Sequence, residues 1–155
     1  MSNYVNKIFY FFNFQKNSIN IKEFNNCFKD ENEVLDLLKA SINIFKHISN
    51  IQNFSSLLND GNMHCHEIEN ATIKLVSRIL KEYGFNDEKI SNIFEDKVYQ
   101  VKISNKSRMV FYLIDVNIIV PLFVDTNHQV YCNSSYDTNC ANNKFSLYIN
   151  KEHYF

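Results

Sequence analysis

The segment that decides the fold is residues 108–131, which read RMVFYLIDVNIIVPLFVDTNHQVY. Two runs within it, 108–114 and 118–124, are rich in β-branched and aromatic residues and flank a short polar stretch at 115–117. This pattern predicts two antiparallel strands joined by a hairpin loop. Because Pro121 interrupts the second run, we expect that strand to lie at a sheet edge or to contain a bulge.

The residues on either side of this hairpin extend the predicted sheet. Residues 97–103 alternate in the manner of a strand, and a turn at 105–107 leads from them into the hairpin. A turn at 125–127 follows the hairpin, and residues 145–149 are a candidate last strand. The polar stretch 133–144 is expected to be a mobile loop. The sequence therefore predicts an antiparallel β-meander towards the C-terminus.

The first helix shows the clearest helical periodicity in the chain. Asp30 is placed to cap its N-terminus, with Glu33 reaching back to the backbone in the manner of a capping box. The apolar residues that follow recur at helical spacing and are expected to face the core: Val34, Leu38, Ile42, Phe45 and Ile48.

Three further helical segments are predicted. A short helix is expected over 54–58, and a longer amphipathic helix over 73–83 ends at Gly84, which suits the position after a helix C-terminus. Asn86 is a candidate cap for a fourth helix that runs to residue 94.

The predicted fold class is α+β, with an N-terminal strand at 8–14, three or four helices, and then a C-terminal antiparallel β-meander. Residues 19–28 are compatible with more than one state. No internal repeat or linker divides the chain, so we expect a single domain over 1–155.

Composition limits the classes of function. The chain has 16 Lys and Arg residues against 17 Asp and Glu residues, a net charge of −1, so it has no global basic field that would concentrate a polyanion. Any contact with nucleic acid would require a local basic patch. The hydrophobic fraction of 45% in 155 residues is enough for an ordinary globular core.

Cysteine usage and hydropathy predict a cytoplasmic protein without a membrane partner. The longest apolar run near the N-terminus, residues 8–12, is too short for a signal sequence or a membrane span. The four cysteines match no zinc-binding spacing and are expected to be reduced: Cys27, Cys65, Cys132 and Cys140. No cofactor is predicted, and the oligomeric state is left open.

The candidate catalytic residues lie at the two ends of the decisive hairpin. In an antiparallel hairpin, the start of one strand lies beside the end of the next, so Arg108 is expected near Asp125, His128 and Tyr131. An Arg can stabilise the charge on a scissile phosphate, and a His or Tyr can move protons, which suits RNA phosphodiester cleavage. The alternative is structural, with Arg108 as a surface residue paired with Asp125 and His128 as a turn residue.

A second candidate group is the stretch His64-Cys65-His66-Glu67. On an extended segment, His64 and His66 would point to the same side and could chelate one metal ion, with His128 or Asp125 completing the shell. The same two histidines could instead act as general bases beside Arg108, because histidine titrates near neutral pH. The structural alternative is a helix-entry loop in which the histidines cap backbone groups.

The layout of strand, helices and meander, with Arg108 opening the hairpin and His128 and Tyr131 following it, resembles the RelE/YoeB-like superfamily of bacterial mRNA interferase toxins. The pattern spans residues 9–131. The sequence resembles more closely a group of uncharacterised bacterial proteins with an HxH segment and a terminal R-hairpin-DxNHxxY pattern.

The resemblance to the toxins implies a compact α+β domain that cleaves mRNA and is inhibited by a cognate antitoxin. It also implies that Arg108 binds phosphate and that His128 and Tyr131 are the acid and base. The chain departs from that superfamily in being longer and less basic, and in that His128 and Tyr131 are not adjacent.

Three hypotheses follow, in order of preference. The first is a toxin-type endoribonuclease in a toxin–antitoxin or phage-defence setting, with RNA as substrate and His64 or His66 assisting the hairpin residues. The second is a non-enzymatic interaction protein, namely an antitoxin, an immunity protein or an inhibitor, which suits the near-neutral charge. The third is a metal-dependent hydrolase that uses His64, His66 and His128 as ligands.

Overall fold

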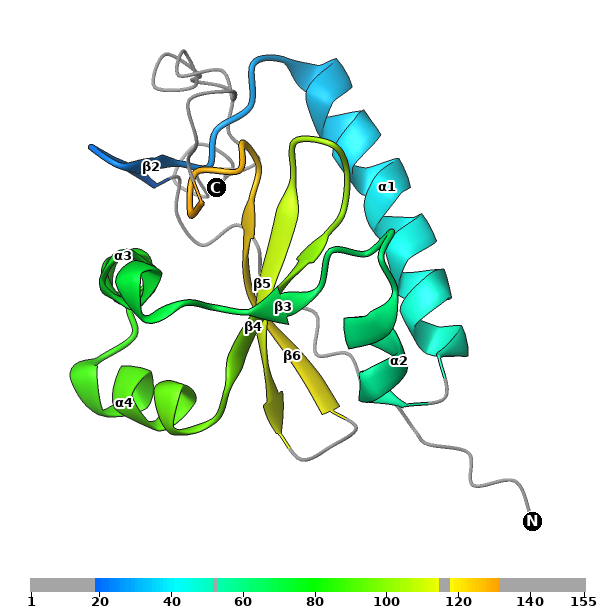
Figure 1. Cartoon of the computed structure of the whole chain (residues 1–155). Helices are drawn as coiled ribbons and strands as arrows, with labels where there is room; N and C mark the ends of the chain where they lie inside the picture. Colours follow the sequence, from blue (N-terminus) through cyan, green and yellow to red (C-terminus); the bar gives the residue numbers. More distant parts are fainter. Residues whose placement is uncertain (1–18, 52, 115–117, 132–155) are drawn as a thin grey trace, which may run out of the picture.

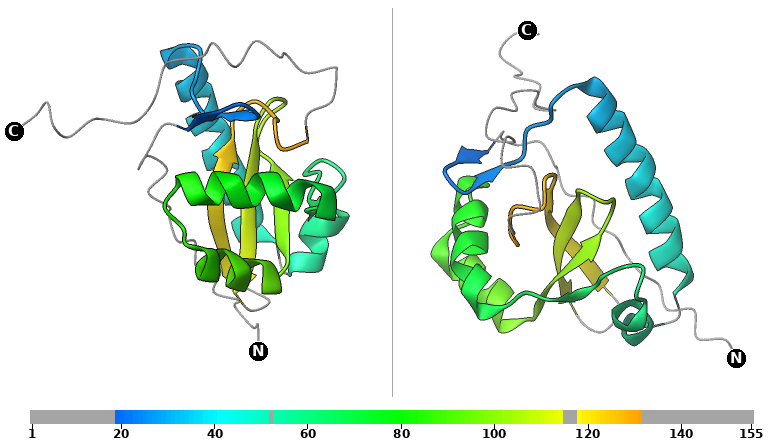
Figure 2. Two further views of the ribbon diagram at one scale, coloured as in Figure 1. Left: turned by 90° about the vertical axis from the view of Figure 1, so that its left-hand side faces the viewer. Right: turned by 45° about the horizontal axis from the view of Figure 1, so that its top comes forward.

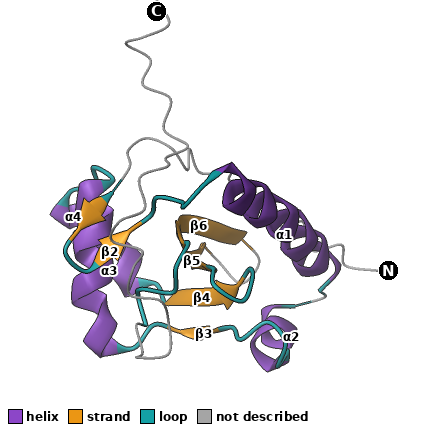
Figure 3. Cartoon of the chain, turned by 90° about the horizontal axis from the view of Figure 1, so that it is seen from above, coloured by secondary structure: helices purple, strands orange, loops and turns teal. Residues whose placement is uncertain are grey.

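A four-stranded antiparallel sheet between two layers of helices organises the chain (Figure 1). The computed structural model describes residues 19–51, 53–114 and 118–131. The elements in chain order are β1 (Asn20–Ile21), β2 (Phe24–Asn25), α1 (Glu31–Asn50), α2 (Phe54–Asn59), β3 (His66–Glu67), α3 (Asn70–Glu82), α4 (Asp87–Glu95), β4 (Val98–Lys102), β5 (Arg108–Ile114) and β6 (Ile118–Asp125). The view from above shows α1 and α2 on one side of the sheet and α3 and α4 on the other (Figure 3).

The predicted α+β fold class is confirmed. Within the described residues, four helices precede the meander β4-β5-β6, and every strand pair of the sheet is antiparallel. The ambiguous segment 19–28 contains the small hairpin β1-β2. The predicted strands at 8–14 and 145–149 and the predicted loop at 133–144 lie outside the described residues.

The helix ends follow the capping residues of the sequence. Asp30 Oδ1 accepts a hydrogen bond from the Glu33 N–H at 3.1 Å, and Glu33 Oε2 accepts one from the Lys29 N–H at 2.7 Å. Asn86 caps α4 through the Lys89 N–H at 2.8 Å. Gly84 has a φ of +86° after the end of α3, a conformation that glycine adopts without steric cost.

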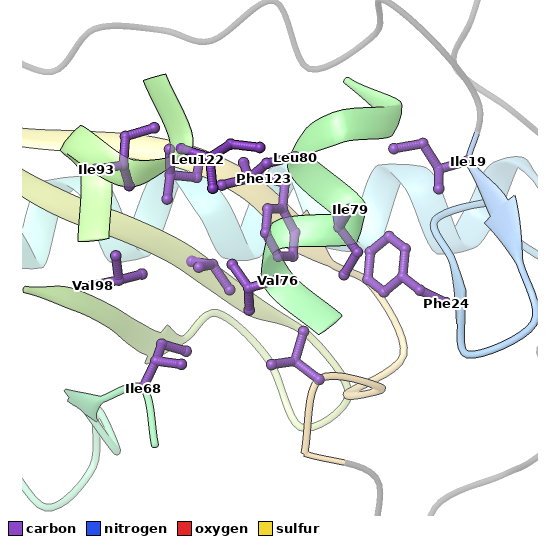
Figure 4. Close-up of a cluster of buried hydrophobic side chains, with 13 residues drawn as sticks. Ile19, Phe24, Ile68, Val76, Ile79, Leu80, Ile93, Val98, Leu122 and Phe123 are labelled. Atoms are coloured by element: carbon purple, nitrogen blue, oxygen red, sulfur yellow. The ribbon is translucent and has the colours of Figure 1, made fainter. Parts of the chain in front are cut away.

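One hydrophobic core lies between the sheet and helices α3 and α4. Side chains from both helices interlock with the sheet and with the β1-β2 hairpin, as the close-up shows (Figure 4). The fully buried Val76, Ile79 and Leu80 of α3 form the centre of this core. The left view of Figure 2 shows α3 and α4 lying across the strands in front of this face.

A second core lies on the opposite face of the sheet, against α1 and α2. Val101, Met109 and Phe111 of the sheet pack there with Ile48 of α1 and Leu57 of α2. Because side chains alternate between the two faces of a strand, the neighbours of these residues point towards the α3 side. On β4, Tyr99 and Val101 face α1 and α2, so Val98, Gln100 and Lys102 face α3. The α3 side of this strand therefore carries one apolar residue followed by two polar ones.

The structure corrects one part of the predicted core. Val34 and Ile48 of α1 are buried, but Leu38 and Ile42 are 50% and 54% exposed, and Leu35 is 52% exposed. The apolar stripe of α1 is therefore wider than the surface it covers. Among the described residues, no helix has the length and apolarity needed to cross a membrane.

Both expectations for Pro121 are met. The strand that contains it, β6, lies at the edge of the four-stranded sheet. Val110 pairs with Phe123, whereas Phe111 pairs with Pro121, so the register shifts by one residue and Leu122 forms a bulge. This bulge allows the consecutive residues Leu122 and Phe123 both to enter the α3-side core.

Candidate functional site

All five residues predicted to be catalytic line one open pocket of about 710 Å³. It lies at the end of the sheet where the β4–β5 turn and the segment after β6 come together, the upper end in Figure 1. The lining residues are His64, Cys65, His66, Glu69, Gln100, Lys102, Asn105, Arg108, His128 and Tyr131.

Strand register explains why residues distant in the sequence meet in this pocket. Lys102 of β4 pairs with Arg108 of β5, and Arg108 pairs with Asp125 of β6, so these three residues form one row across the sheet. Two rows further along the sheet, His66 of β3 pairs with Gln100 of β4. The predicted proximity of Arg108 and Asp125 is thus confirmed by the hairpin register.

The Lys102–Arg108 pair is unusual for a sheet. Two like charges directly opposite each other on neighbouring strands destabilise the pairing. Asp125, the third member of the row, is completely buried and accepts several backbone hydrogen bonds.

Arg108 is a buried residue, not the surface strand residue of the structural alternative. Its side chain is 7% exposed, and its Nη1 donates hydrogen bonds to the carbonyl oxygens of Ser104 at 2.9 Å and Ser107 at 3.0 Å. The guanidinium is therefore tied to the β4–β5 turn. The Ser107 hydroxyl donates to the Thr126 carbonyl at 3.1 Å, which connects that turn to the segment after β6.

Asp125 organises the segment that carries His128 and Tyr131. Its Oδ1 accepts hydrogen bonds from the N–H groups of Asn127 at 3.3 Å and Gln129 at 2.8 Å, and its Oδ2 accepts one from Val130 at 2.7 Å. Complete burial raises the pKa of the Asp125 carboxyl, and the backbone N–H groups and nearby His128 act in the opposite direction.

A second set of contacts attaches the same segment to the β1-β2 hairpin. The Gln129 side chain accepts a hydrogen bond from the Asn25 N–H at 2.9 Å and donates one to the Asn25 carbonyl at 2.7 Å. These two bonds satisfy the backbone of Asn25 in the way that a neighbouring strand would. The segment is thus fixed from both sides, by Asp125 and by β2.

His128 adopts a left-handed backbone conformation, with a φ of +56°, in the turn after β6. Its Nδ1 lies 3.1 Å from the Tyr131 carbonyl oxygen. A carbonyl only accepts hydrogen bonds, so Nδ1 carries the proton and Nε2 is the basic nitrogen of the neutral ring. His128 is therefore both a turn residue and a residue of the pocket, with its tautomer set by the backbone.

The Tyr131 hydroxyl lies at the N-terminus of α3. It accepts a hydrogen bond from the Glu69 N–H at 2.7 Å, and the Thr72 hydroxyl lies 3.5 Å away. The Tyr131 ring meets the His66 ring edge to face, with 5.2 Å between ring centroids. Because the Glu69 N–H occupies one lone pair of the hydroxyl oxygen, the phenolic proton remains available to a group in the pocket.

The His66 ring is held by two hydrogen bonds. Its Nδ1 lies 3.0 Å from the Glu67 carbonyl oxygen and must donate to it, so Nε2 accepts from Gln100 Nε2 at 2.7 Å. Gln100 is only 3% exposed, and within the described residues its Oε1 has no hydrogen-bond partner. His66 is thus a ring held in position beside a buried acceptor.

His64 departs from the predicted extended segment. Its φ is +42°, in the left-handed region, so His64 and His66 do not share a face by strand alternation. Both still line the pocket. Nowhere in the described ranges do three His, Cys, Asp or Glu side chains group closely enough to hold a metal ion. The predicted ligand set, His64 and His66 with either His128 or Asp125, is therefore not assembled among the described residues.

Cys65 lines the pocket but is poorly suited to be a nucleophile. The side chain is buried, and burial raises the pKa of its thiol to about 12. The thiolate is the reactive form of cysteine, and it is scarce at neutral pH when the pKa is so high. The pocket also offers other polar side chains, which include three histidines, a tyrosine, an arginine and a lysine.

Four lining residues were not among the sequence-based candidates: Glu69, Gln100, Lys102 and Asn105. Lys102 could have been found, because a hairpin centred on residues 104–107 places it opposite Arg108. Gln100 could not, because its role depends on its pairing with β3, whose two residues carry no strand pattern of their own.

The fold and the pocket define an α+β protein with a polar pocket at an end of its sheet. The chain belongs to the family described as "Uncharacterised protein UU032", whose model matches residues 10–153. No curated protein and no solved structure matches the chain.

Proposed function

We propose that the pocket binds a phosphodiester group of RNA and cleaves it by general acid–base catalysis. The observation that carries this proposal is the convergence of three histidines, a tyrosine, an arginine and a lysine on one pocket. Side chains that bind phosphate and side chains that move protons are the two requirements of this reaction.

The phosphate position is assigned to Lys102 and Arg108. The two cationic side chains are cross-strand neighbours, and both line the pocket. They supply the local basic patch that a chain with a net charge of −1 needs in order to contact nucleic acid. The charge that develops on the phosphate oxygens in the transition state would be stabilised by the same pair.

His128 is assigned the role of general base. Its Nδ1–H is directed to the Tyr131 carbonyl, so Nε2 would accept the proton of the substrate's 2′-hydroxyl. The 2′-oxygen then forms a bond to phosphorus, and the bond from phosphorus to the 5′-oxygen breaks. The products would be a 2′,3′-cyclic phosphate and a 5′-hydroxyl end.

Tyr131 is assigned the role of general acid that protonates the departing 5′-oxygen. The Glu69 N–H, which already donates to the Tyr131 oxygen at 2.7 Å, would stabilise the resulting phenolate. His64 is the other candidate acid, because its exposed ring lines the same pocket. The variants Tyr131→Phe and His64→Gln separate these two assignments, since only loss of the true acid should abolish cleavage.

The RelE/YoeB-like resemblance supports the same reaction in a toxin-type setting. Its implied residues, Arg108, His128 and Tyr131, all line the pocket. Under this proposal, the protein is a cytoplasmic endoribonuclease whose activity is restrained by a cognate antitoxin. Expression of the chain alone should arrest bacterial growth, and Arg108→Ala should relieve that arrest.

The test of the proposed activity is cleavage of RNA by purified protein, with and without ribosomes. Arg108→Ala and His128→Asn should each lower the cleavage rate at least about 100-fold. The matched control is Arg78→Ala, because Arg78 is 54% exposed and pairs with Glu23 away from the pocket. Intact RNA in both reactions, or equal rates for the Arg108 and Arg78 variants, would refute the proposal.

A second candidate function is a non-enzymatic interaction protein, such as an antitoxin, an immunity protein or an inhibitor. The observation in its favour is the row of half-exposed apolar side chains on α1, formed by Leu35, Leu38 and Ile42. Under this proposal, Leu38→Glu should abolish binding of a stoichiometric partner in the native host, whereas Lys39→Glu on the same helix should retain it. Equal retention by both variants would count against this function.

A further inference from the structure

The buried acceptor of Gln100 is the feature of the pocket that the proposed cleavage reaction does not use. Gln100 is 3% exposed and lines the pocket, and its Oε1 has no hydrogen-bond donor within the described part of the chain. Buried polar atoms are nearly always hydrogen-bonded, and an unsatisfied one is costly. An orphaned acceptor beside a pocket therefore suggests a donor that arrives with a ligand.

The orientation of the Gln100 amide is set by its neighbour. Gln100 Nε2 lies 2.7 Å from His66 Nε2, and His66 Nδ1 lies 3.0 Å from the Glu67 carbonyl. With Nδ1–H donating to that carbonyl, Nε2 of the neutral imidazole form accepts, so the amide presents its nitrogen to His66. Rotating the amide by 180° would place Gln100 Oε1 against the accepting Nε2 of His66. The Gln100 Oε1 atom is therefore kept on the side of the amide that faces away from His66.

The surroundings of this acceptor suit a planar, aromatic ligand. The His66 and Tyr131 rings meet edge to face at 5.2 Å between centroids, and both line the pocket. Nucleobases bind proteins by stacking on such rings while a buried polar side chain contacts their edge. Lys102 lies two residues beyond Gln100 on the same face of β4, about 7 Å along the strand. A phosphate attached to such a base would therefore have a cationic partner nearby.

We propose that Gln100, His66 and Tyr131 form a nucleobase subsite that selects adenine or cytosine, whose exocyclic amino group lies beside an unprotonated ring nitrogen, over uracil. An amino group projects from the base edge and can donate to the recessed Oε1 of Gln100. The N3–H of uracil lies between two carbonyl oxygens, which would be brought against the Gln100 oxygen. This inference rests on the proposed function, because it takes the Lys102–Arg108 pair as the phosphate position.

Binding of nucleoside monophosphates tests this subsite without requiring any cleavage. The probes are AMP, CMP, UMP and purine riboside 5′-monophosphate, which is AMP without its amino group, and affinities are measured by isothermal titration calorimetry. We expect AMP and CMP to bind about tenfold more tightly than UMP and purine riboside monophosphate, as one satisfied buried acceptor predicts. Gln100→Met removes the acceptor and should abolish both preferences, that for AMP over purine riboside monophosphate and that for CMP over UMP.

Several outcomes would overturn the subsite. These are equal affinity of the native protein for AMP and purine riboside monophosphate, absence of nucleotide binding, and an amino-group preference that persists in Gln100→Met. If the variant does not fold, the comparison of AMP with purine riboside monophosphate on the native protein decides alone. RNA cleavage without base preference would refute the subsite and leave the proposed function intact. Binding that prefers bases with an amino group, without any RNA cleavage, would support the subsite and refute the proposed cleavage.

Discussion

Replacing Asp125 by asparagine should loosen the segment that carries His128 and Tyr131. Asparagine retains one oxygen, which can still accept the N–H groups of Asn127 and Gln129. Its amide nitrogen takes the place of Oδ2, which accepts the Val130 N–H at 2.7 Å in the native protein. The substitution therefore removes the hydrogen bond from the Val130 N–H to Oδ2 and leaves a buried N–H opposite another donor.

The expected loss in the free energy of unfolding is about 2–4 kcal/mol, the sum of a lost buried hydrogen bond and an unsatisfied buried donor. Urea denaturation followed by circular dichroism measures it. The matched control is Asp87→Asn, because Asp87 pairs with Lys81 on the surface and its side chain is 84% exposed. The control should lose less than about 1 kcal/mol.

The same variant has a second, local readout. NMR spectra of the histidine rings should show a changed environment for His128, whose turn depends on Asp125, and an unchanged one for His47, which lies on α1. If Asp125→Asn is as stable as Asp87→Asn, or if the His128 signals do not move, Asp125 does not organise the pocket in the way argued above.

Three further predictions concern groups outside the reaction itself. Because its thiol pKa is raised to about 12, Cys65 should resist iodoacetamide at pH 7.5 in the folded protein and react once urea unfolds it; rapid labelling of the native state would contradict this. A hydrogen bond from His47 lowers the pKa of Asp60, so its contribution to stability should be present above the usual Asp pKa and be lost as the pH falls through the folded-state value. NMR titration of the Asp60 carboxyl should accordingly give a higher midpoint in His47→Ala, and an unchanged midpoint would refute the pairing. Leu80→Ala should lower the free energy of unfolding by about 2–5 kcal/mol and Leu38→Ala by less than about 1 kcal/mol, because Leu80 is fully buried and Leu38 is 50% exposed. Equal losses in urea denaturation would contradict this difference in burial between Leu80 and Leu38.

The meander and the helix ends could be predicted from the sequence because their signals are local. The run 108–114 carries β-branched and aromatic residues between two turns, and β5 has the same limits. Asp30 and Asn86 cap helices because their short side chains reach the backbone N–H groups three residues on. Local patterns of this kind do not depend on what packs against them.

The error on α1 has a different origin. Helical periodicity shows which residues share a face, but not how much of that face another element covers. In the structure, Val34 and Ile48 of α1 are buried, whereas Leu38 and Ile42 between them remain half exposed. The extent of the core therefore depends on the placement of the helix across the sheet, which one segment of sequence does not encode.

The candidate site was predictable in part for a topological reason. A hairpin brings the start of one strand beside the end of the next, so Arg108 and the residues after β6 had to approach each other. His66 lies in the pocket because the two-residue strand β3 pairs with β4, although helices α3 and α4 separate these strands in the sequence. Gln100 and Lys102 acquire their positions from these pairings, and no local motif marks them.

Analysis of product ends on a defined RNA tests the proposed cleavage activity most directly. The substrates are a short RNA and the same molecule with a single 2′-deoxy substitution at each cleaved linkage, offered with and without ribosomes. The proposed mechanism predicts 2′,3′-cyclic phosphate and 5′-hydroxyl ends, and no cleavage at the substituted linkage, because the 2′-hydroxyl is the nucleophile. Intact RNA under all conditions, or continued cleavage at a linkage without its 2′-hydroxyl, would contradict it.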